Sequence, residues 1–106
     1  MTISERYRKI LEQIEIEADR LYEVLPENTV KALRQVDRAA EEMQDFSESV
    51  GEIPQFQLES KLSPVLLKAH SCLDRARVLL EDAGHSKEGS TVWEMEQLVY
   101  RLLNDL

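Results

Sequence analysis

Apolar residues recur at alternating steps of four and three along the first quarter of the chain, which is the spacing of one face of an α-helix. Pro26 ends this stretch, because its ring cannot continue a helix without losing a hydrogen bond and clashing with the preceding turn. The pattern predicts a helix over residues 4–25 with a single apolar seam. The seam consists of Tyr7, Leu11, Ile14, Ala18, Leu21 and Leu25.

A second apolar pattern predicts a helix over residues 29–50. Asn28 or Thr29 can cap its first turn, because a short polar side chain accepts hydrogen bonds from the free amides there. Gly51 ends the pattern, and the segment 51–62 connects to the next helix, either as a loop or with a helical turn of its own. The seam consists of Val30, Leu33, Val36, Ala40, Met43, Val50 and Ile53.

The third pattern is the most regular and predicts a helix over residues 61–83. Leucine alternates with alanine along it, so a neighbouring helix can approach the small positions closely, and the leucines are expected to be among the most buried side chains. Ser63 and Pro64 suit the first turn of a helix, although the seam already includes Leu62 and so allows a start one turn earlier. Gly84 suits the left-handed residue that closes a helix. The seam consists of Leu62, Leu66, Ala69, Leu73, Ala76, Leu80 and Ala83.

The fourth pattern predicts a helix over residues 91–106. Thr91 and Glu94 have the spacing of a capping box, in which two side chains satisfy amides of the first turn. The preceding residues 85–90, HSKEGS, are polar and are expected to form a loop. The apolar face of this helix consists of Met95, Leu98, Val99, Leu102, Leu103 and Leu106.

These patterns predict an all-α protein. No stretch alternates apolar and polar residues with the period of a strand, and the chain has only 3 glycines and 3 prolines. A chain of 106 residues is expected to form a single domain over 1–106. The seams favour a four-helix up-down-up-down antiparallel bundle with heptad-like seams. The long connection over 51–62 leaves a rearranged topology as the main alternative.

The charge balance narrows the choice of partners. The chain has 13 basic and 21 acidic residues and a formal net charge of −8, without a run of basic residues, so no nucleic-acid partner is expected. No stretch has the length and apolar character of a membrane span, so no membrane partner is expected. Cys72 is the single cysteine and lies among apolar positions. It indicates a small buried side chain and a reducing, cytoplasmic location. The sequence contains no Gly-rich phosphate loop, no Cys or His pair at zinc spacing and no Glu-x-x-His motif, so no cofactor is expected.

Carboxylates recur at steps of four, three and four at Glu41, Asp45, Glu48 and Glu52. Mg²⁺ prefers oxygen ligands, so Glu41, Glu42 and Asp45 are candidate metal ligands. These three residues resemble the paired glutamates of the all-α nucleotide pyrophosphohydrolases, and the resemblance implies a Mg²⁺-dependent enzyme. The Glu-x-x-Asp motif that this family carries on its next helix does not follow in the rest of the chain.

The direction of this acidic row speaks against a metal site. At about 100° per residue, the carboxylates point away from the apolar face of the second helix. Arg34 and Arg38 share their side and can form surface ion pairs with Glu41 and Asp45. We therefore expect the row to be exposed to solvent and to hold no metal. A similar outward stripe on the first helix consists of Glu12, Glu15, Asp19 and Glu23.

A ridge of polar residues follows one side of the third helix. His70 lies four residues before Asp74, and Arg77 and Glu81 continue the ridge. A His–Asp pair is half of a nucleophile-activating triad, but Cys72 lies on another side of the helix and no serine is placed to receive the pair. The ridge is interpreted as an ion-paired strip at the edge of the core.

Trp93 and Tyr100 lie on the side of the fourth helix away from its apolar face, with Gln97 and Asn104 beside them. Three interpretations are open: one ring folds over the edge of the core, a neighbouring segment such as 55–58 covers both rings, or the rings form an interface. Large aromatic side chains with a polar tip are enriched at protein contacts. We therefore predict that these four residues form an interface between chains.

The sequence thus predicts a non-catalytic protein of the adaptor or regulatory type. We expect it to act by protein–protein binding and to self-associate as a homodimer through its C-terminal helix. Two alternatives stay open. One is a Mg²⁺-dependent enzyme of the nucleotide pyrophosphohydrolase type that uses Glu41, Glu42 and Asp45. The other is an acidic inhibitor or antitoxin-like decoy that offers its carboxylates to a basic partner.

Overall fold

The computed structural model describes residues 1–106 and contains four α-helices, three short 3₁₀ segments and no strand. The all-α class with four helices is thereby confirmed. The α-helices are α1 (Ile3–Val24), α2 (Val30–Gln44), α3 (Leu58–Asp82) and α4 (Ser86–Asn104). The 3₁₀ segments are η1 (Glu27–Thr29), η2 (Val50–Glu52) and η3 (Gln55–Gln57).

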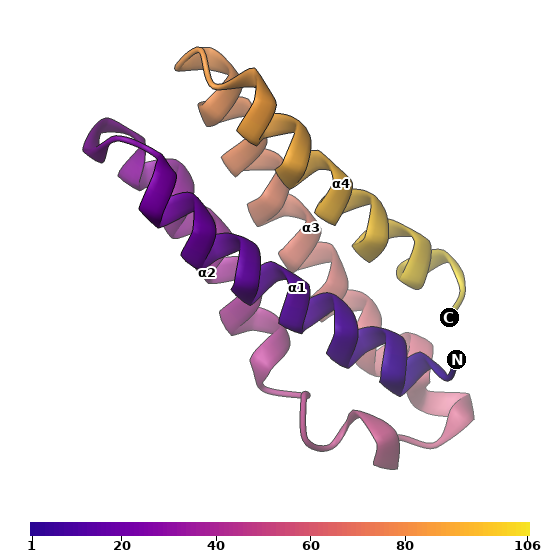
Figure 1. Cartoon of the computed structure of the whole chain (residues 1–106). Coiled ribbons are helices and arrows are strands. Elements are labelled where there is room, and N and C mark those ends of the chain that lie inside the picture. The colour runs from indigo at the N-terminus through magenta and orange to yellow at the C-terminus, as the bar shows by residue number, and fades with distance from the viewer.

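The four helices lie side by side in an elongated molecule of 43 × 21 × 20 Å (Figure 1). α3 packs extensively against both α2 and α4, whereas α1 contacts α2 and α4 less closely. The two chain termini lie at the same end of the molecule (Figure 1), where Arg6 and Asp105 form an ion pair of 2.8 Å. The side between α1 and α4 is therefore the most loosely packed side of the molecule.

One continuous cluster of apolar side chains fills the space between the helices. The expectation that Leu66, Leu73 and Leu80 are among the most buried side chains is confirmed. The seam predicted for α1 is also buried, apart from its partly covered last residue, whereas Val30 and Ala83 at the ends of two other seams are exposed. The fully shielded residues of α3 are Leu62, Leu66, Ala69, Leu73, Ala76 and Leu80.

α2 ends well before residue 50, so the predicted extent of this helix is wrong. Two side chains of α1 bind carbonyls at this end of α2. The Tyr7 hydroxyl donates to the Met43 carbonyl at 2.5 Å, and Arg8 Nε donates to the Ser47 carbonyl at 2.8 Å. Val50 is nevertheless buried, because the turn η2 returns it to the core. Contacts with a helix that is distant in the sequence thus determine where α2 ends.

The connection between α2 and α3 contains the turns η2 and η3, and α3 begins at Leu58. The helix therefore begins three residues before the predicted start at residue 61, and Pro64 lies inside it rather than in its first position. The alternative of an earlier start, which Leu62 in the seam allowed, is confirmed. Leu58 and Leu62 are one turn apart and both buried. Their burial offsets the one backbone hydrogen bond that Pro64 cannot donate.

α4 begins almost directly after α3, so the expectation of a polar loop over residues 85–90 is wrong. Gly84 closes α3 with a φ of 85°, the left-handed conformation that was expected of it. Gly89 then lets the start of α4 approach α3, since a Cβ at this position would stand 3.0 Å from Cγ of Glu81. The close packing of two helices thus converts a polar segment into the first turns of α4.

The capping box predicted for Thr91 and Glu94 is not formed, because both residues lie inside α4. The Thr91 hydroxyl instead donates to the Lys87 carbonyl at 3.4 Å, within the helix. No side chain caps the amide end of α4. The start of this helix is therefore held by its packing against α3 rather than by a local cap.

Leu73 offers a direct test of the buried seam of α3. We expect Leu73→Ala to lower the free energy of unfolding by about 2–5 kcal/mol, because a cavity replaces packed contacts. Leu67→Ala is a matched control on the same helix, since Leu67 is 54% exposed, and should change the free energy by less than about 1 kcal/mol. Urea unfolding followed by circular dichroism measures both. Equal losses would contradict the central position of Leu73.

Candidate functional site

The outer side of α4 carries Trp93 and Tyr100, which are 49% and 48% exposed. Gln97 is half-buried between them, and Asn104 is exposed one turn beyond Tyr100. These four residues therefore form one outward row, the α4 row. The opposite side of the helix faces the core with Val92, Met95, Val99 and Leu102.

No neighbouring segment covers the two rings. The hollow beside Trp93 is lined only by residues of α1 and α4, among them Gln13 and Leu98. Phe56, at the centre of the segment 55–58, is itself 84% exposed. The interpretation in which this segment covers both rings is therefore wrong.

The two aromatic side chains of the α4 row have different neighbours. Trp93 adjoins Gln13 of α1 across the hollow. Tyr100 adjoins His70 of α3, with ring centroids 6.0 Å apart and the ring planes inclined by 50°. The α4 row thus extends from the α1 edge of the helix to its α3 edge.

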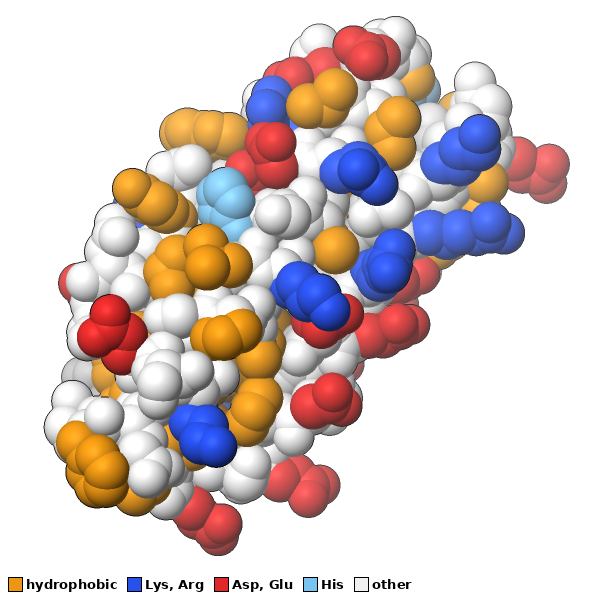
Figure 2. Space-filling model, turned by 180° about the vertical axis from the view of Figure 1, so that it is seen from behind, with side chains coloured by type: hydrophobic (Ala, Val, Ile, Leu, Met, Phe, Trp, Pro, Cys, Tyr) orange, Lys and Arg blue, Asp and Glu red, His pale blue; other side chains and the backbone are white.

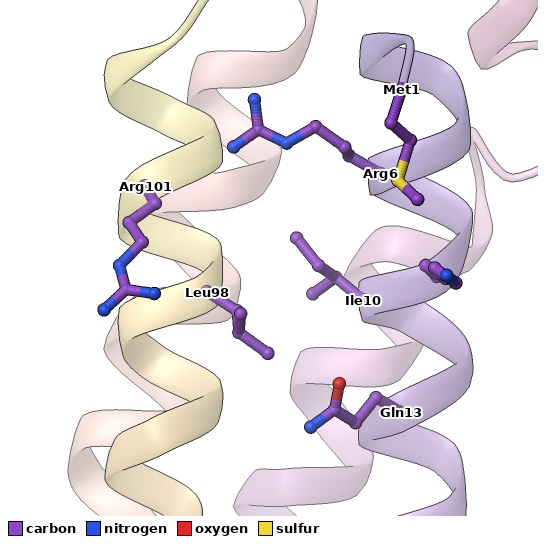
Figure 3. A pocket seen from close by; sticks show the side chains of 7 residues that line it. Met1, Arg6, Ile10, Gln13, Leu98 and Arg101 are labelled. Atoms are coloured by element: carbon purple, nitrogen blue, oxygen red, sulfur yellow. The ribbon is translucent and has the colours of Figure 1, made fainter.

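A groove runs between α1 and α4 on the Trp93 side. It contains a cavity of about 450 Å³, into which Ile10 of α1 and Leu98 of α4 point (Figure 3). The hollow beside Trp93 shares Gln13, Leu98 and Arg101 with this cavity, so the two form one continuous groove. Its basic lining residues are Arg6, Lys9 and Arg101.

Glu96 lies on the α3 side of α4 and is only 3% exposed, which the apolar pattern of this helix does not predict. Its Oε1 atom accepts no hydrogen bond. Its closest contacts with basic side chains are Arg77 Nε at 3.4 Å and His70 Nε2 at 3.6 Å. Burial, followed by the negative charge of Asp74, raises the pKa of the Glu96 carboxyl to about 7.

Arg77 of α3 is shared by three carboxylates. Its Nη2 donates to Asp74 Oδ1 at 2.8 Å, and its Nη1 donates to Glu81 Oε2 at 2.7 Å. The hydrogen bond from Arg77 lowers the pKa of Asp74. One guanidinium does not neutralise three carboxylates, so protonation of one carboxyl is favoured. Glu96 takes up this proton because it is the most buried of the three. The ion-paired ridge predicted on α3 is confirmed for these two pairs, whereas His70 faces α4.

The neighbourhood of His70 contains no activated nucleophile. His70 contacts Glu96 and Tyr100, and no hydrogen bond joins it to a serine or a cysteine. Cys72 packs against the core but is only half-buried, whereas a buried side chain was expected. Burial raises the pKa of its thiol, which disfavours the reactive thiolate.

The acidic row does not share one helical face, because α2 ends before Asp45 and the chain turns over residues 45–49. The side chain of Glu42 is half-buried and pairs with Lys68 at 3.7 Å. No group of three or more His, Cys, Asp or Glu side chains that could hold a metal ion is formed. The exposed carboxylates of the row are Glu41, Asp45, Glu48 and Glu52.

The surface ion pairs predicted for Arg34 and Arg38 with Glu41 and Asp45 are absent. Each such pair contributes only a few tenths of a kcal/mol, so solvated side chains compete with it. Arg38 instead lies within electrostatic reach of the Cys72 thiol, on the side of α2 next to α3. The four exposed carboxylates of the acidic row therefore form no ion pair within 4.0 Å.

Comparisons with protein-family models, with curated proteins and with solved structures give no match. None of the helices combines the length and the apolar character that a membrane crossing requires. The arrangement of the side chains is therefore the basis for assigning a function.

Glu96 is expected to make the stability of the protein depend on pH. Its pKa of about 7 exceeds the ordinary value of 4.5, so the folded protein holds a proton that the unfolded chain releases. The stabilisation is fully present below about pH 4.5 and is lost as the pH rises through about 7. At about 1.4 kcal/mol per pKa unit, the loss is roughly 3 kcal/mol. Asp74, with its lowered pKa, contributes in the opposite direction at more acid pH.

Glu96→Gln keeps a neutral side chain at this position and should remove the loss of stability between about pH 5 and pH 8. Urea unfolding at a series of pH values measures the effect. Glu94→Gln is the control, because Glu94 is an exposed residue of the same helix, and should keep the wild-type pH dependence. The same pH dependence in wild type and Glu96→Gln would contradict the assignment of the proton to Glu96.

The acidic row is expected to bind no divalent metal ion tightly. Titration of the wild type with Mg²⁺ or Mn²⁺ in a calorimeter should give no saturable heat, because separate, exposed carboxylates do not replace the hydration shell of these ions. Saturable binding that is lost in Glu42→Gln and Asp45→Asn would overturn this prediction. It would also favour the nucleotide pyrophosphohydrolase alternative. Glu12→Gln on α1 is the control for a change of charge alone.

Proposed function

We propose that this chain is a non-catalytic helical protein that acts by binding another protein, including a second copy of itself. The α4 row carries this proposal, since its two large aromatic side chains are about half exposed on a helix whose other side is buried. Exposed aromatics of this size promote association and bury a large area on contact. One side of α4 thus serves the core, and the other serves a partner.

The proposed architecture behind this surface is an up-down-up-down antiparallel bundle with heptad-like seams. Its support is the four-and-three spacing of the buried positions on α1 and α3, together with the tight turn at Gly84. A packed bundle holds its outer side chains on rigid helices. Such a surface loses less conformational entropy on binding than a flexible segment does.

The simplest partner is a second copy related by a two-fold axis, with the two α4 helices in contact. In such a dimer the same row of residues serves both copies. Gln97 and Asn104 carry amides that both donate and accept hydrogen bonds, and they lie between and beyond the rings. The α4 row therefore combines apolar area with polar groups that can be satisfied across the contact.

The charge and the single cysteine are consistent with this class of function. A net charge of −8 disfavours an extended nucleic acid as ligand, so the proposed partner is a protein. Cys72 is a free thiol, which suits a reducing cytoplasm.

The proposal predicts a self-association that depends on the α4 row. Size-exclusion chromatography coupled to light scattering should give the wild type about twice the mass of the 12.3 kDa chain. Trp93→Ala and Tyr100→Ala should each shift the mass toward the monomer. The loss of a central aromatic contact costs about 2 kcal/mol or more, which weakens binding roughly 30-fold.

Phe56→Ala is the matched control for these changes, because Phe56 is a more exposed aromatic residue that lies outside α4. Its mass should equal that of the wild type. A monomeric wild type at micromolar concentration would remove the proposed homodimer. A dimer that neither α4 change affects would move the contact to another surface.

A further inference from the structure

Cations gather on the face formed by α2 and α3, although the protein as a whole is acidic. Figure 2 shows a diagonal row of Lys and Arg across this face, which lies on the far side in Figure 1. The charges of Arg38, Lys68 and Arg75, and the opposing charge of Glu42, all act on the Cys72 thiol, so each of these side chains lies within electrostatic reach of it. Lys61, seven residues before Lys68, continues their line along α3. These four cations are called the basic strip.

Most cations of the basic strip lack an ion-pair partner. Lys68 pairs with Glu42 at 3.7 Å. The other three cations of the strip have no ion-pair partner within 4.0 Å, and all four side chains are exposed. Three cations of the strip are therefore free to pair with carboxylates of a second surface.

A complementary surface lies on α1. Glu5, Glu12 and Asp19 follow one another at seven-residue steps, which places them on one side of the helix, and all three are exposed. These three carboxylates are called the acidic ridge. The outward stripe predicted for this helix is confirmed as exposed, and its members are Glu12, Glu15, Asp19 and Glu23.

The acidic ridge and the basic strip have the same spacing. Lys61, Lys68 and Arg75 also follow at seven-residue steps, so charges in both sets are about 10 Å apart along their helices. Both helices run along the long dimension of an elongated molecule (Figure 1). A ridge laid along a strip can therefore bring three carboxylates opposite three cations at once.

The two surfaces also lie at matching heights along the molecule. Arg8 of α1 reaches Ser47 at one end of the second helix, while Glu42, about one turn from Ser47, pairs with Lys68 of α3. Glu12 lies one turn after Arg8 on α1. Because α1 and α2 run in opposite directions (Figure 1), this step leads from the end of α2 back toward Glu42. Glu12 therefore lies near the level of Lys68, so copies set side by side with little shift can pair their charges.

We propose that copies of this protein associate through the acidic ridge of one copy and the basic strip of the next. The contact is heterologous, because it joins two different surfaces, and each copy keeps one free surface for a further neighbour. It uses faces other than the α4 row and does not depend on the proposed α4 dimer. Together, the two contacts would link dimers into larger assemblies.

A second copy fits the basic strip better than a long polyanion does. The strip is one row of charges wide, it contains Glu42, and the rest of the molecule carries a net negative charge that repels a broad anionic ligand. The acidic ridge supplies a narrow row of carboxylates at the spacing of the strip. Exposed ion pairs contribute little individually and are screened by salt, so the association is weak and depends on ionic strength.

The test starts from a background in which Trp93 and Tyr100 are both changed to Ala, so that the α4 contact does not contribute. Sedimentation equilibrium at about 0.02 M salt should show self-association of this background protein. At about 0.3 M salt the association should weaken, since charges about 10 Å apart are then screened. A background protein that stays monomeric at low salt overturns this proposal, and it leaves the α4 dimer to be judged from the wild type.

Charge exchange then identifies the two surfaces. In this background, Lys68→Glu with Arg75→Glu reverses the strip, and Glu12→Lys with Asp19→Lys reverses the ridge. Each double variant alone should associate about tenfold more weakly or worse, because like charges then face each other. An equimolar mixture should associate again, since the reversed strip of one meets the reversed ridge of the other. Failure of the mixture to associate overturns the proposal.

Lys87→Glu with Arg101→Glu is the matched control, because both residues are exposed cations of α4 outside the two surfaces, and the change alters the net charge by the same amount as the strip variant. This control should associate as the background protein does. An equal loss in the control and in the strip variant would show an effect of net charge alone and would overturn the proposal.

Discussion

The packing of α3 between α2 and α4 is the constraint on which the rest of the structure depends. The leucines and alanines of α3 occupy the centre of the core, and the small alanines let both neighbouring helices come close. Because α2 and α4 are both aligned on α3, α1 completes the molecule with fewer contacts, and it packs least closely against α4. The groove between α1 and α4, and the exposure of Trp93 at its edge, follow from this unequal packing.

The same close approach of α3 and α4 buries Glu96 and raises the pKa of its carboxyl. Gly89 brings the two helices together, and a carboxyl on the α3 side of α4 is then enclosed by the side chains of both. With Arg77 as the nearest permanent cation among three carboxylates, protonation of the buried group relieves the excess negative charge. Tyr100 meets His70 at the outer rim of this cluster. The pH-sensitive cluster and the α4 row therefore share a boundary.

The net charge of the chain does not describe how its charged side chains are arranged on the surface. A value of −8 describes the field at long range, where it repels extended polyanions. At contact the relevant distance is the Debye length of about 8–10 Å. Over such distances the face of α2 and α3 presents three cations without an ion-pair partner, besides Lys68, which pairs with Glu42. The identity of a partner therefore depends on which side chains share a face, and composition does not contain that information.

The sequence by itself determined the number of helices, the buried seams of α1 and α3, and the left-handed turn at Gly84, because periodicity and turn chemistry act over a few residues. It also placed the aromatic pair on the outer side of α4. Tertiary structure alone decided where α2 ends and where α4 begins. Tyr7 and Arg8 bind carbonyls at the end of α2. Gly89 lets the first turns of α4 lie close against α3. The sequence did hold a local signal for the burial of Glu96, because this residue lies four positions after Val92 and three positions before Val99, and both valines are buried. Its burial and its proton nevertheless depend on the register of α3 against α4, which is set by packing between residues far apart in the chain.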